Sequence, residues 1–138
     1  MKRKHKALIA IFLVIGIGLF FGVRGVRSIV EKLNAGVEHM ENMDFSDLDL
    51  KLIENGTYEG SYSVFPISVK VKVTVENHKI TSIELIRHSN GRGAPAEKII
   101  DKVLKKQSLQ VDAVSGATYS SNVILKAIEN ALVEDNDQ

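Results

Sequence analysis

The chain has 138 residues, 44% of them hydrophobic, and it contains no cysteine. This length allows one domain with appendages, and the absence of cysteine excludes disulfides, thiolate metal sites and thiol catalysis. Without the six Lys and Arg residues found up to Arg27, 12 basic residues remain against 17 acidic ones, which leaves the rest of the chain near −5. Such a charge argues against a nucleic-acid-binding role.

The N-terminal segment has the pattern of a membrane anchor. Residues 1–6 are basic, and residues 7–23 carry no charge. A helix of this apolar length is roughly 25 Å long, and Arg24 and Arg27 can extend the span toward the headgroups. We therefore predict a transmembrane anchor over residues 7–27, in contact with the lipid bilayer.

A cleaved signal peptide is the competing interpretation, although no clear small-x-small cleavage site follows the apolar run. Four Lys and Arg residues precede the span and only two follow it closely. This difference predicts a cytoplasmic N-terminus and an extracytoplasmic C-terminal domain in the cell membrane.

Residues 28–53 are predicted to join the anchor to a folded domain. Apolar residues between Ile29 and Met40 follow helical spacing, which predicts a stalk helix. An acidic linker is expected over residues 44–49, and the domain boundary is placed near Ile53.

The next stretch predicts a three-stranded antiparallel meander. Alternation from Tyr58 to Val64 indicates a first strand, and the strict alternation over residues 67–76 is typical of a strand buried on one face. The third strand is expected over residues 80–87. Because Ile80 is out of phase with that strand, we expect a bulge or a late strand start there.

Two amphipathic helices are predicted after the strands, over residues 96–106 and 120–133, with a flexible loop at residues 89–95 before the first. Sheet followed by helices indicates an α+β domain over residues 54–133, a small antiparallel β-meander packed with two C-terminal helices. The transmembrane helix and the helical stalk precede this domain, and an acidic tail, residues 134–138, follows it.

Polar and small residues gather before the last helix, in the run Asp112-Ala113-Val114-Ser115-Gly116-Ala117-Thr118-Tyr119-Ser120-Ser121. The N-terminus of a helix favours anions such as phosphate, and Gly116 can adopt a positive φ and let a ligand approach. Ser and Thr in this position are also common helix caps, with glycine as a turn residue. The residues alone leave both interpretations open, a cap formed by Thr118 or Ser120 and a phosphate site.

The same run resembles the D-x-x-S/T-G-A-T signature of the FMN-binding domain family, whose members include the C subunit of the sodium-translocating NADH:quinone reductase and the G subunit of the Rnf complex. The resemblance extends over about residues 54–133, and includes Asn55-Gly56-Thr57-Tyr58-Glu59-Gly60 and Lys79-Ile80-Thr81-Ser82-Ile83. It implies that Thr118 is esterified to the phosphate of FMN by a separate Mg²⁺-dependent flavin transferase, which uses FAD as donor and releases AMP. By position, the other cofactor-binding residues are Asp112, Ser115, Gly116, Ala117, Tyr119 and Ser120.

The resemblance implies a membrane-anchored extracytoplasmic electron carrier between a membrane donor and an extracytoplasmic acceptor, rather than a stand-alone enzyme. The alternatives are a non-redox ligand-binding or regulatory module, and a small flavin-dependent reductase, for which only His88, Arg87 and Arg92 offer acid–base groups. His88 is interpreted as a surface histidine at a strand end, and Tyr119 as either a core anchor or a flavin-stacking face. Because the domain is short, the flavin ring is expected to be largely exposed.

Overall fold

A computed structural model of the protein describes residues 2–41, 43–89 and 94–133, so part of the predicted loop, residues 90–93, and the predicted acidic tail lie outside the described residues. The chain divides into two compact units, Met1–Ala35 and Gly36–Gln138.

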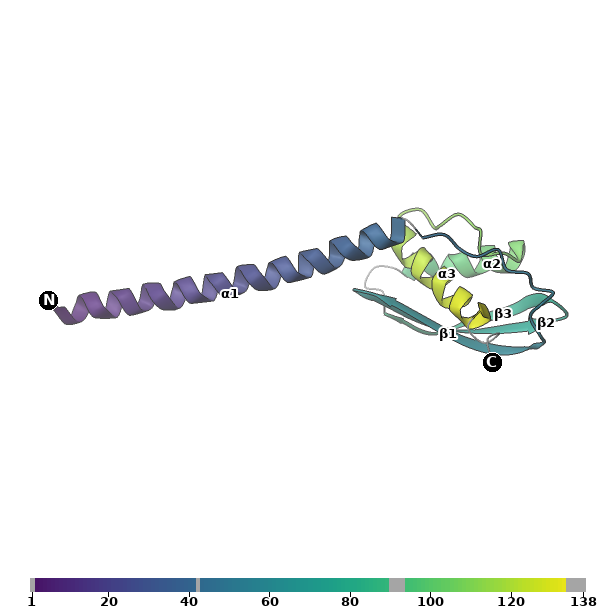
Figure 1. Ribbon diagram of the computed structural model, residues 1–138, viewed down its shortest axis with the longest axis horizontal. Helices are drawn as coiled ribbons and strands as arrows, with labels where there is room; N and C mark the ends of the chain where they lie inside the picture. The colour runs from purple at the N-terminus through teal and green to yellow at the C-terminus, as the bar shows by residue number, and fades with distance from the viewer. Residues whose placement is uncertain (1, 42, 90–93, 134–138) are drawn as a thin grey trace. The chain divides into compact units, whose positions relative to one another are not determined.

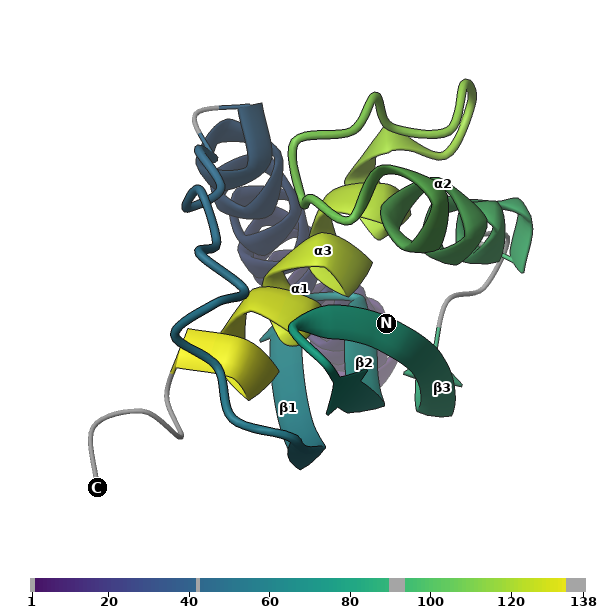
Figure 2. The same cartoon turned by 90° about the vertical axis from the view of Figure 1, so that its right-hand side faces the viewer.

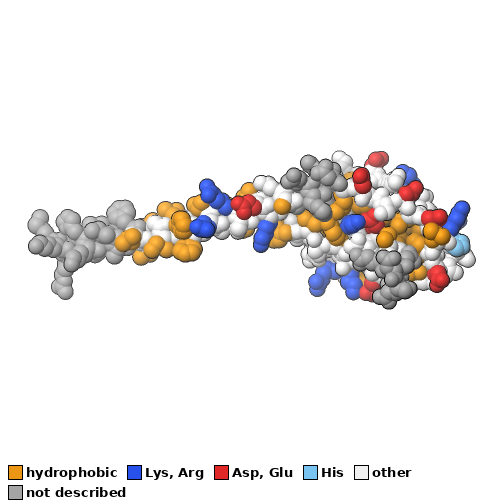
Figure 3. All heavy atoms as spheres, in the orientation of Figure 1, with side chains coloured by type: hydrophobic (Ala, Val, Ile, Leu, Met, Phe, Trp, Pro, Cys, Tyr) orange, Lys and Arg blue, Asp and Glu red, His pale blue; other side chains and the backbone are white. Residues whose placement is uncertain are grey.

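Helix α1 (Lys2–Glu41) is one uninterrupted α-helix across both the predicted anchor and the predicted stalk (Figure 1). Its segment Leu13–Ala35 is long and apolar enough to cross a membrane, by length and composition, a test that a signal sequence also passes. At ~1.5 Å per residue this segment is about 35 Å long, which exceeds the hydrocarbon thickness of a bilayer. Its apolar side chains are exposed, and the space-filling view shows them on the described part of the helix before the first Lys and Arg side chains (Figure 3).

The second unit contains a three-stranded antiparallel sheet in the order β1-β2-β3, which confirms the predicted meander (Figure 1). Its strands are β1 (Gly56–Val64), β2 (Ile67–Glu76) and β3 (Lys79–Ser89). Val64 pairs with Ile67, so only Phe65 and Pro66 form the turn between β1 and β2. The valines of β2 are all buried, as the strict alternation predicts for a strand with one face toward the core.

The pairing of β2 with β3 shifts register twice. At the shift nearer the start of β3, Thr74 faces Ser82 and Val75 faces Ile80, which leaves Thr81 as the extra residue of a bulge. The bulge turns Ile80 into the core, where it is 3% exposed. The irregularity predicted at Ile80 is therefore confirmed.

Three helical segments follow the sheet: η1 (Ala94–Lys98, a 3-10 helix), α2 (Ile99–Lys106) and α3 (Thr118–Val133). The helices α2 and α3 lie over one face of the sheet (Figure 2), so the predicted α+β fold is confirmed. Gln107 ends α2 in the left-handed conformation, and its side-chain amide pairs with the backbone of Ile80 at 2.8 and 2.9 Å. This amide attaches the end of α2 to the first residues of β3.

Helix α3 packs directly on β1 at Gly60. A Cβ added to Gly60 would lie 2.2 Å from the Ala127 carbonyl oxygen and 2.4 Å from the Ala131 nitrogen, both backbone atoms of α3. The Asn130 side chain donates a hydrogen bond to the Ser61 carbonyl beside this contact (3.0 Å). Glycine is required here because any side chain would push the helix off the strand.

The residues predicted as an acidic linker pack on the core of the second unit. Met43, Phe45, Leu48 and Leu50 are partly buried against it. The Ser46 amide donates to the Glu129 carboxylate (2.7 Å), which is 3% exposed and also pairs with Lys126. We call residues 43–53 the strap, since they lie along the domain rather than apart from it.

Candidate functional site

The signature residues form a tight turn that leads into α3. The Ala117 amide donates to the Val114 carbonyl (2.9 Å), and Gly116 adopts φ +77° within this turn. The Ser121 amide donates to the Ala117 carbonyl (2.9 Å), which makes Ala117 the capping position and Thr118 the first helical residue. The helix begins two residues earlier than predicted, so the first turn contains Thr118 itself.

Neither predicted capping hydroxyl therefore occupies the capping position. Ala117 holds it, and a methyl group accepts no hydrogen bond from the first amides of the helix. Thr118 is exposed, whereas Ser120, two residues further, is 5% exposed. The Thr118 hydroxyl is thus accessible to another molecule.

The predicted site residues separate into two groups by exposure. The exposed group contains Asp112, Ser115, Gly116 and Thr118. Ala117 and Ser120 are buried among core residues, and Tyr119 is half-buried. The first group can meet a cofactor, while the second fixes the turn on the domain.

Two residues outside the predicted set hold the turn in place. Lys102 of α2 donates from Nζ to the Asp112 carbonyl (2.7 Å) and lies 3.5 Å from that of Ala113. The buried Ser121 hydroxyl accepts a hydrogen bond from the Val114 amide (3.1 Å). Ser121 could be noticed in the sequence because it belongs to the signature run. The contact of Lys102 could not be predicted, because no sequence pattern relates Lys102 to Asp112, ten residues later.

Tyr119 connects the start of α3 to the turn between β1 and β2. Its hydroxyl donates to the Phe65 carbonyl at 3.0 Å. Burial raises the pKa of the Tyr119 hydroxyl, and the neighbouring Tyr62 raises it further. Tyr119 therefore acts as an anchor between two elements that are 54 residues apart in sequence.

The interpretation of His88 as a surface histidine is wrong. Its side chain is only 4% exposed, and Nδ1 lies 3.0 Å from a carboxylate oxygen of Glu97 in η1. The position at a strand end was predicted, but the covering 3-10 helix η1 was not, because the loop before it gives no periodic signal. The pair joins the end of β3 to η1.

The turn before Thr118 has open space at Gly116. A Cβ added to Gly116 would meet no other atom of the described residues within 4 Å, so the space above this residue is open. The first amides of α3 have no partner within the helix and carry a partial positive charge. An exposed hydroxyl, open space and a helix N-terminus together fit a phosphate group bonded to Thr118.

Comparison with known proteins identifies the domain. Residues 66–133, from the start of β2 to the end of α3, match the FMN-binding domain family. This part of the chain is an FMN-binding domain. The predicted cofactor, FMN, is thereby confirmed, and the match includes the whole turn before Thr118.

A relative of this FMN-binding domain is a Vibrio harveyi protein named NADH:acrylate oxidoreductase. The two are 29% identical over 107 residues, which cover 75% of this chain and 11% of the relative. The chain thus spans about a tenth of the length of that protein.

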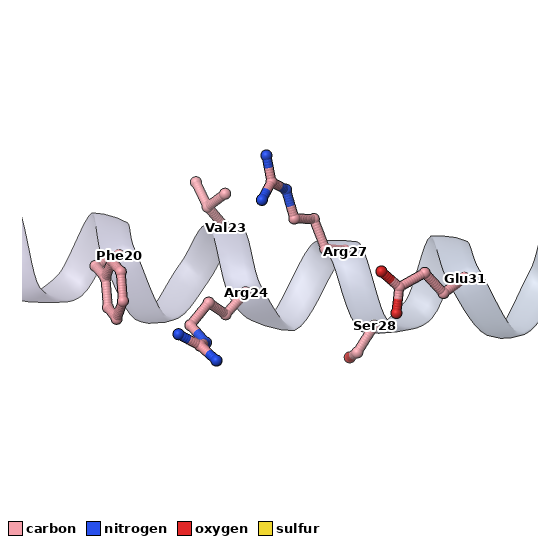
Figure 4. Close-up of a pocket in the computed structure, with 6 residues that line it drawn as sticks. All are labelled: Phe20, Val23, Arg24, Arg27, Ser28 and Glu31. Atoms are coloured by element: carbon pink, nitrogen blue, oxygen red, sulfur yellow. The ribbon is translucent and has the colours of Figure 1, made fainter.

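A hollow on α1 does not add a second site. It is lined by six side chains of this one helix: Phe20, Val23, Arg24, Arg27, Ser28 and Glu31 (Figure 4). The Arg24 guanidinium carbon lies 5.3 Å from the centre of the Phe20 ring. Since consecutive turns of a single helix cannot enclose a ligand, the hollow is open space between neighbouring side chains.

Proposed function

We propose that the protein is a membrane-anchored, extracytoplasmic electron carrier whose FMN is bound covalently through a phosphoester to Thr118. The FMN-binding domain and the flavoprotein relative support the cofactor and a redox role. The apolar segment Leu13–Ala35 supports the anchor. The positive charge that precedes it supports a cytoplasmic N-terminus and an exported domain.

The observation that carries the covalent linkage is the exposure of Thr118 at the first position of α3. The exposed side chain can be reached by a modifying enzyme, and a Cβ added to Gly116, two residues before it, would meet only open space. A buried hydroxyl, such as that of Ser121, is already bonded to the backbone and cannot react in the folded domain.

The attachment step transfers an FMN group from FAD to the Thr118 hydroxyl. The bond between Oγ1 and the phosphorus of the FMN half forms, the pyrophosphate P–O bond breaks, AMP leaves and the hydroxyl proton is released. A separate flavin transferase with bound Mg²⁺ is the proposed partner for this step. The side chains of Asp112 and Ser115 are exposed beside the acceptor and would form part of the surface that this enzyme recognises.

The residues of the chain hold the resulting phosphodiester rather than react with it. The first amides of α3 offset its negative charge, and Lys102 and Ser121 keep the turn in place. Bound FMN supplies the redox chemistry, since it accepts two electrons and can release them one at a time. A covalent bond also prevents loss of the cofactor outside the cell. The membrane electron donor and the extracytoplasmic acceptor would meet the flavin at this exposed end of the domain.

The acrylate oxidoreductase activity in the name of the relative is not proposed for this chain. The match covers 11% of that protein, and a substrate site can lie anywhere in the remaining part.

Mass spectrometry of the intact chain tests the attachment. The full chain is expressed with a flavin transferase and purified in detergent. We expect the wild type to carry the mass of FMN less one water, Thr118→Ala to lack it, and Thr81→Ala to retain it as the matched control for loss of an exposed threonine outside the turn. A wild-type chain without the added mass, or a Thr118→Ala chain that still carries it, refutes the proposal.

A further inference from the structure

The turn between β1 and β2 exposes an aromatic ring. Phe65 is 52% exposed, although a phenylalanine side chain gains most from complete burial. The ring lies in a two-residue turn whose neighbours Val64 and Ile67 pair with each other, so both ends of the turn are fixed by the sheet. Phe65 thus presents an apolar surface at a defined place.

This ring lies at the same end of the domain as the attachment residue. The hydrogen bond from the Tyr119 hydroxyl to the Phe65 carbonyl ties the turn to α3 one residue after Thr118. Tyr119 is half-buried, and Tyr62 lies close enough to raise its pKa. The length of one tyrosine side chain therefore separates the backbone at Phe65 from the start of α3, where Thr118 lies.

We propose that the exposed Phe65 ring is the face on which the isoalloxazine ring of the flavin lies. This inference rests on the proposed attachment at Thr118. The ribityl chain of FMN separates the phosphate from the flavin ring by several bonds, so an attached flavin has the reach of a long side chain. A planar aromatic ligand and an exposed aromatic ring associate in an offset or edge-to-face geometry.

Phe65 is also distinguished from the other exposed apolar residues of the domain. Leu52 is more exposed, at 76%, but it lies in the strap before β1, at the opposite end of the first hairpin, where Gly56 pairs with Val75. Ile86 is the extra residue at the second register shift, in the edge strand β3. Neither has a hydrogen bond connecting its backbone to the start of α3 among the interactions of the described residues.

Flavin fluorescence of the full chain in detergent tests the inference, after mass spectrometry has shown that the samples carry FMN. Contact with the Phe65 ring covers one face of the flavin and shields it from iodide, a collisional quencher. Loss of one aromatic contact shifts the ratio of stacked to unstacked flavin by about two- to tenfold. We therefore expect Phe65→Ala to carry FMN and to be quenched more by iodide than the wild type.

Three further variants make the result specific to the aromatic ring. Phe65→Tyr should stay shielded from iodide and should fluoresce more weakly than the wild type, because a stacked phenol donates an electron to the excited flavin and a phenyl ring does not. Phe65→Leu should behave like Phe65→Ala even though it stays apolar. Leu52→Ala is the matched control for loss of an exposed apolar side chain, and it should leave the flavin signal unchanged.

Flavinylated Phe65→Ala and Phe65→Leu with wild-type iodide quenching, or a Phe65→Tyr chain with wild-type fluorescence, overturn the inference. Such a result would assign Phe65 to a lipid or protein contact instead. That outcome leaves the attachment at Thr118 intact. A wild-type chain without added FMN mass overturns the proposed function first, and the inference with it.

Discussion

Gly60→Ala tests how the domain positions the attachment residue, because Gly60 sets the distance between α3 and β1. The new Cβ would lie 2.2 Å from the Ala127 carbonyl oxygen, whereas ordinary contact begins near 3.4 Å, so the helix must move by about 1.2 Å. The atoms in the way belong to the backbone of α3 and cannot rotate aside. Overpacking of this kind costs about 1–3 kcal/mol, and we expect the upper end of that range.

The three tyrosines of the chain all lie in the second unit, so their near-ultraviolet circular dichroism follows the unfolding of the domain without a signal from α1. For a domain of this size, a loss of about 2–3 kcal/mol lowers the melting temperature by roughly 10–20 °C. Flavinylation of Thr118 should fall in parallel, since α3 carries the acceptor on its first residue.

The matched control is Gly56→Ala in the same strand. There the added Cβ would make ordinary contacts of 3.4–3.6 Å with the Tyr58 ring. Its effect on stability should stay within about 0.5–1 kcal/mol in either direction. If Gly60→Ala and Gly56→Ala melt at the same temperature, α3 does not approach β1 as closely as described, and the argument from helix position to acceptor position fails.

Two further changes test the contacts that hold the strap and the turn. Burial raises the pKa of Glu129, but hydrogen bonds from Lys126 and Ser46 outweigh this effect and place the pKa below the ordinary 4.5. Glu129→Gln should therefore be less stable than the wild type above pH 4.5. The difference in unfolding free energy should vanish as the pH falls through the lowered pKa of the folded state. An equal deficit at pH 3 and pH 7 would exclude a charged Glu129. Lys102→Met removes the hydrogen bond to the Asp112 carbonyl and should speed amide exchange at Ala117, in the same turn, by about five- to tenfold; Lys102→Arg is the control, and unchanged exchange in Lys102→Met would show that the turn needs no support from α2.

The sequence predicts the elements of this domain well, because their patterns are local. The alternation of apolar and polar residues in β2 predicts which face of the strand is buried. The bulge at Thr81 could also be predicted, because Ile80 is out of phase with Ile83 and Leu85. The signature residues around Thr118 could likewise be found from their order alone. Where the helix begins was less predictable, since Tyr119 and Ser120 are neutral in helix preference and the turn before them is set by Gly116.

The contacts that were not predicted all join residues distant in sequence. Gly60 looks like one more glycine in a strand until the backbone of α3 is placed against it. The burial of His88 depends on η1, and the packing of the strap depends on Glu129, a charged residue that a periodic pattern would place at the surface. From the sequence, Phe65 is expected only to be a turn residue. The hydrogen bond from Tyr119 is what connects it with the start of α3 and Thr118.

The site combines a rigid support with an exposed acceptor, and this combination favours covalent attachment over reversible binding. Gly60, Tyr119, Lys102 and Ser121 fix the backbone on which Thr118 lies. A reversible flavin site needs an enclosure that buries most of the ligand, whereas a transferase needs an acceptor that it can reach. Among the described residues, the exposed turn fits the second requirement, and the proposed phosphoester bond would retain the cofactor without enclosure. With FMN attached as proposed, the same openness would leave the flavin ring accessible to electron-transfer partners.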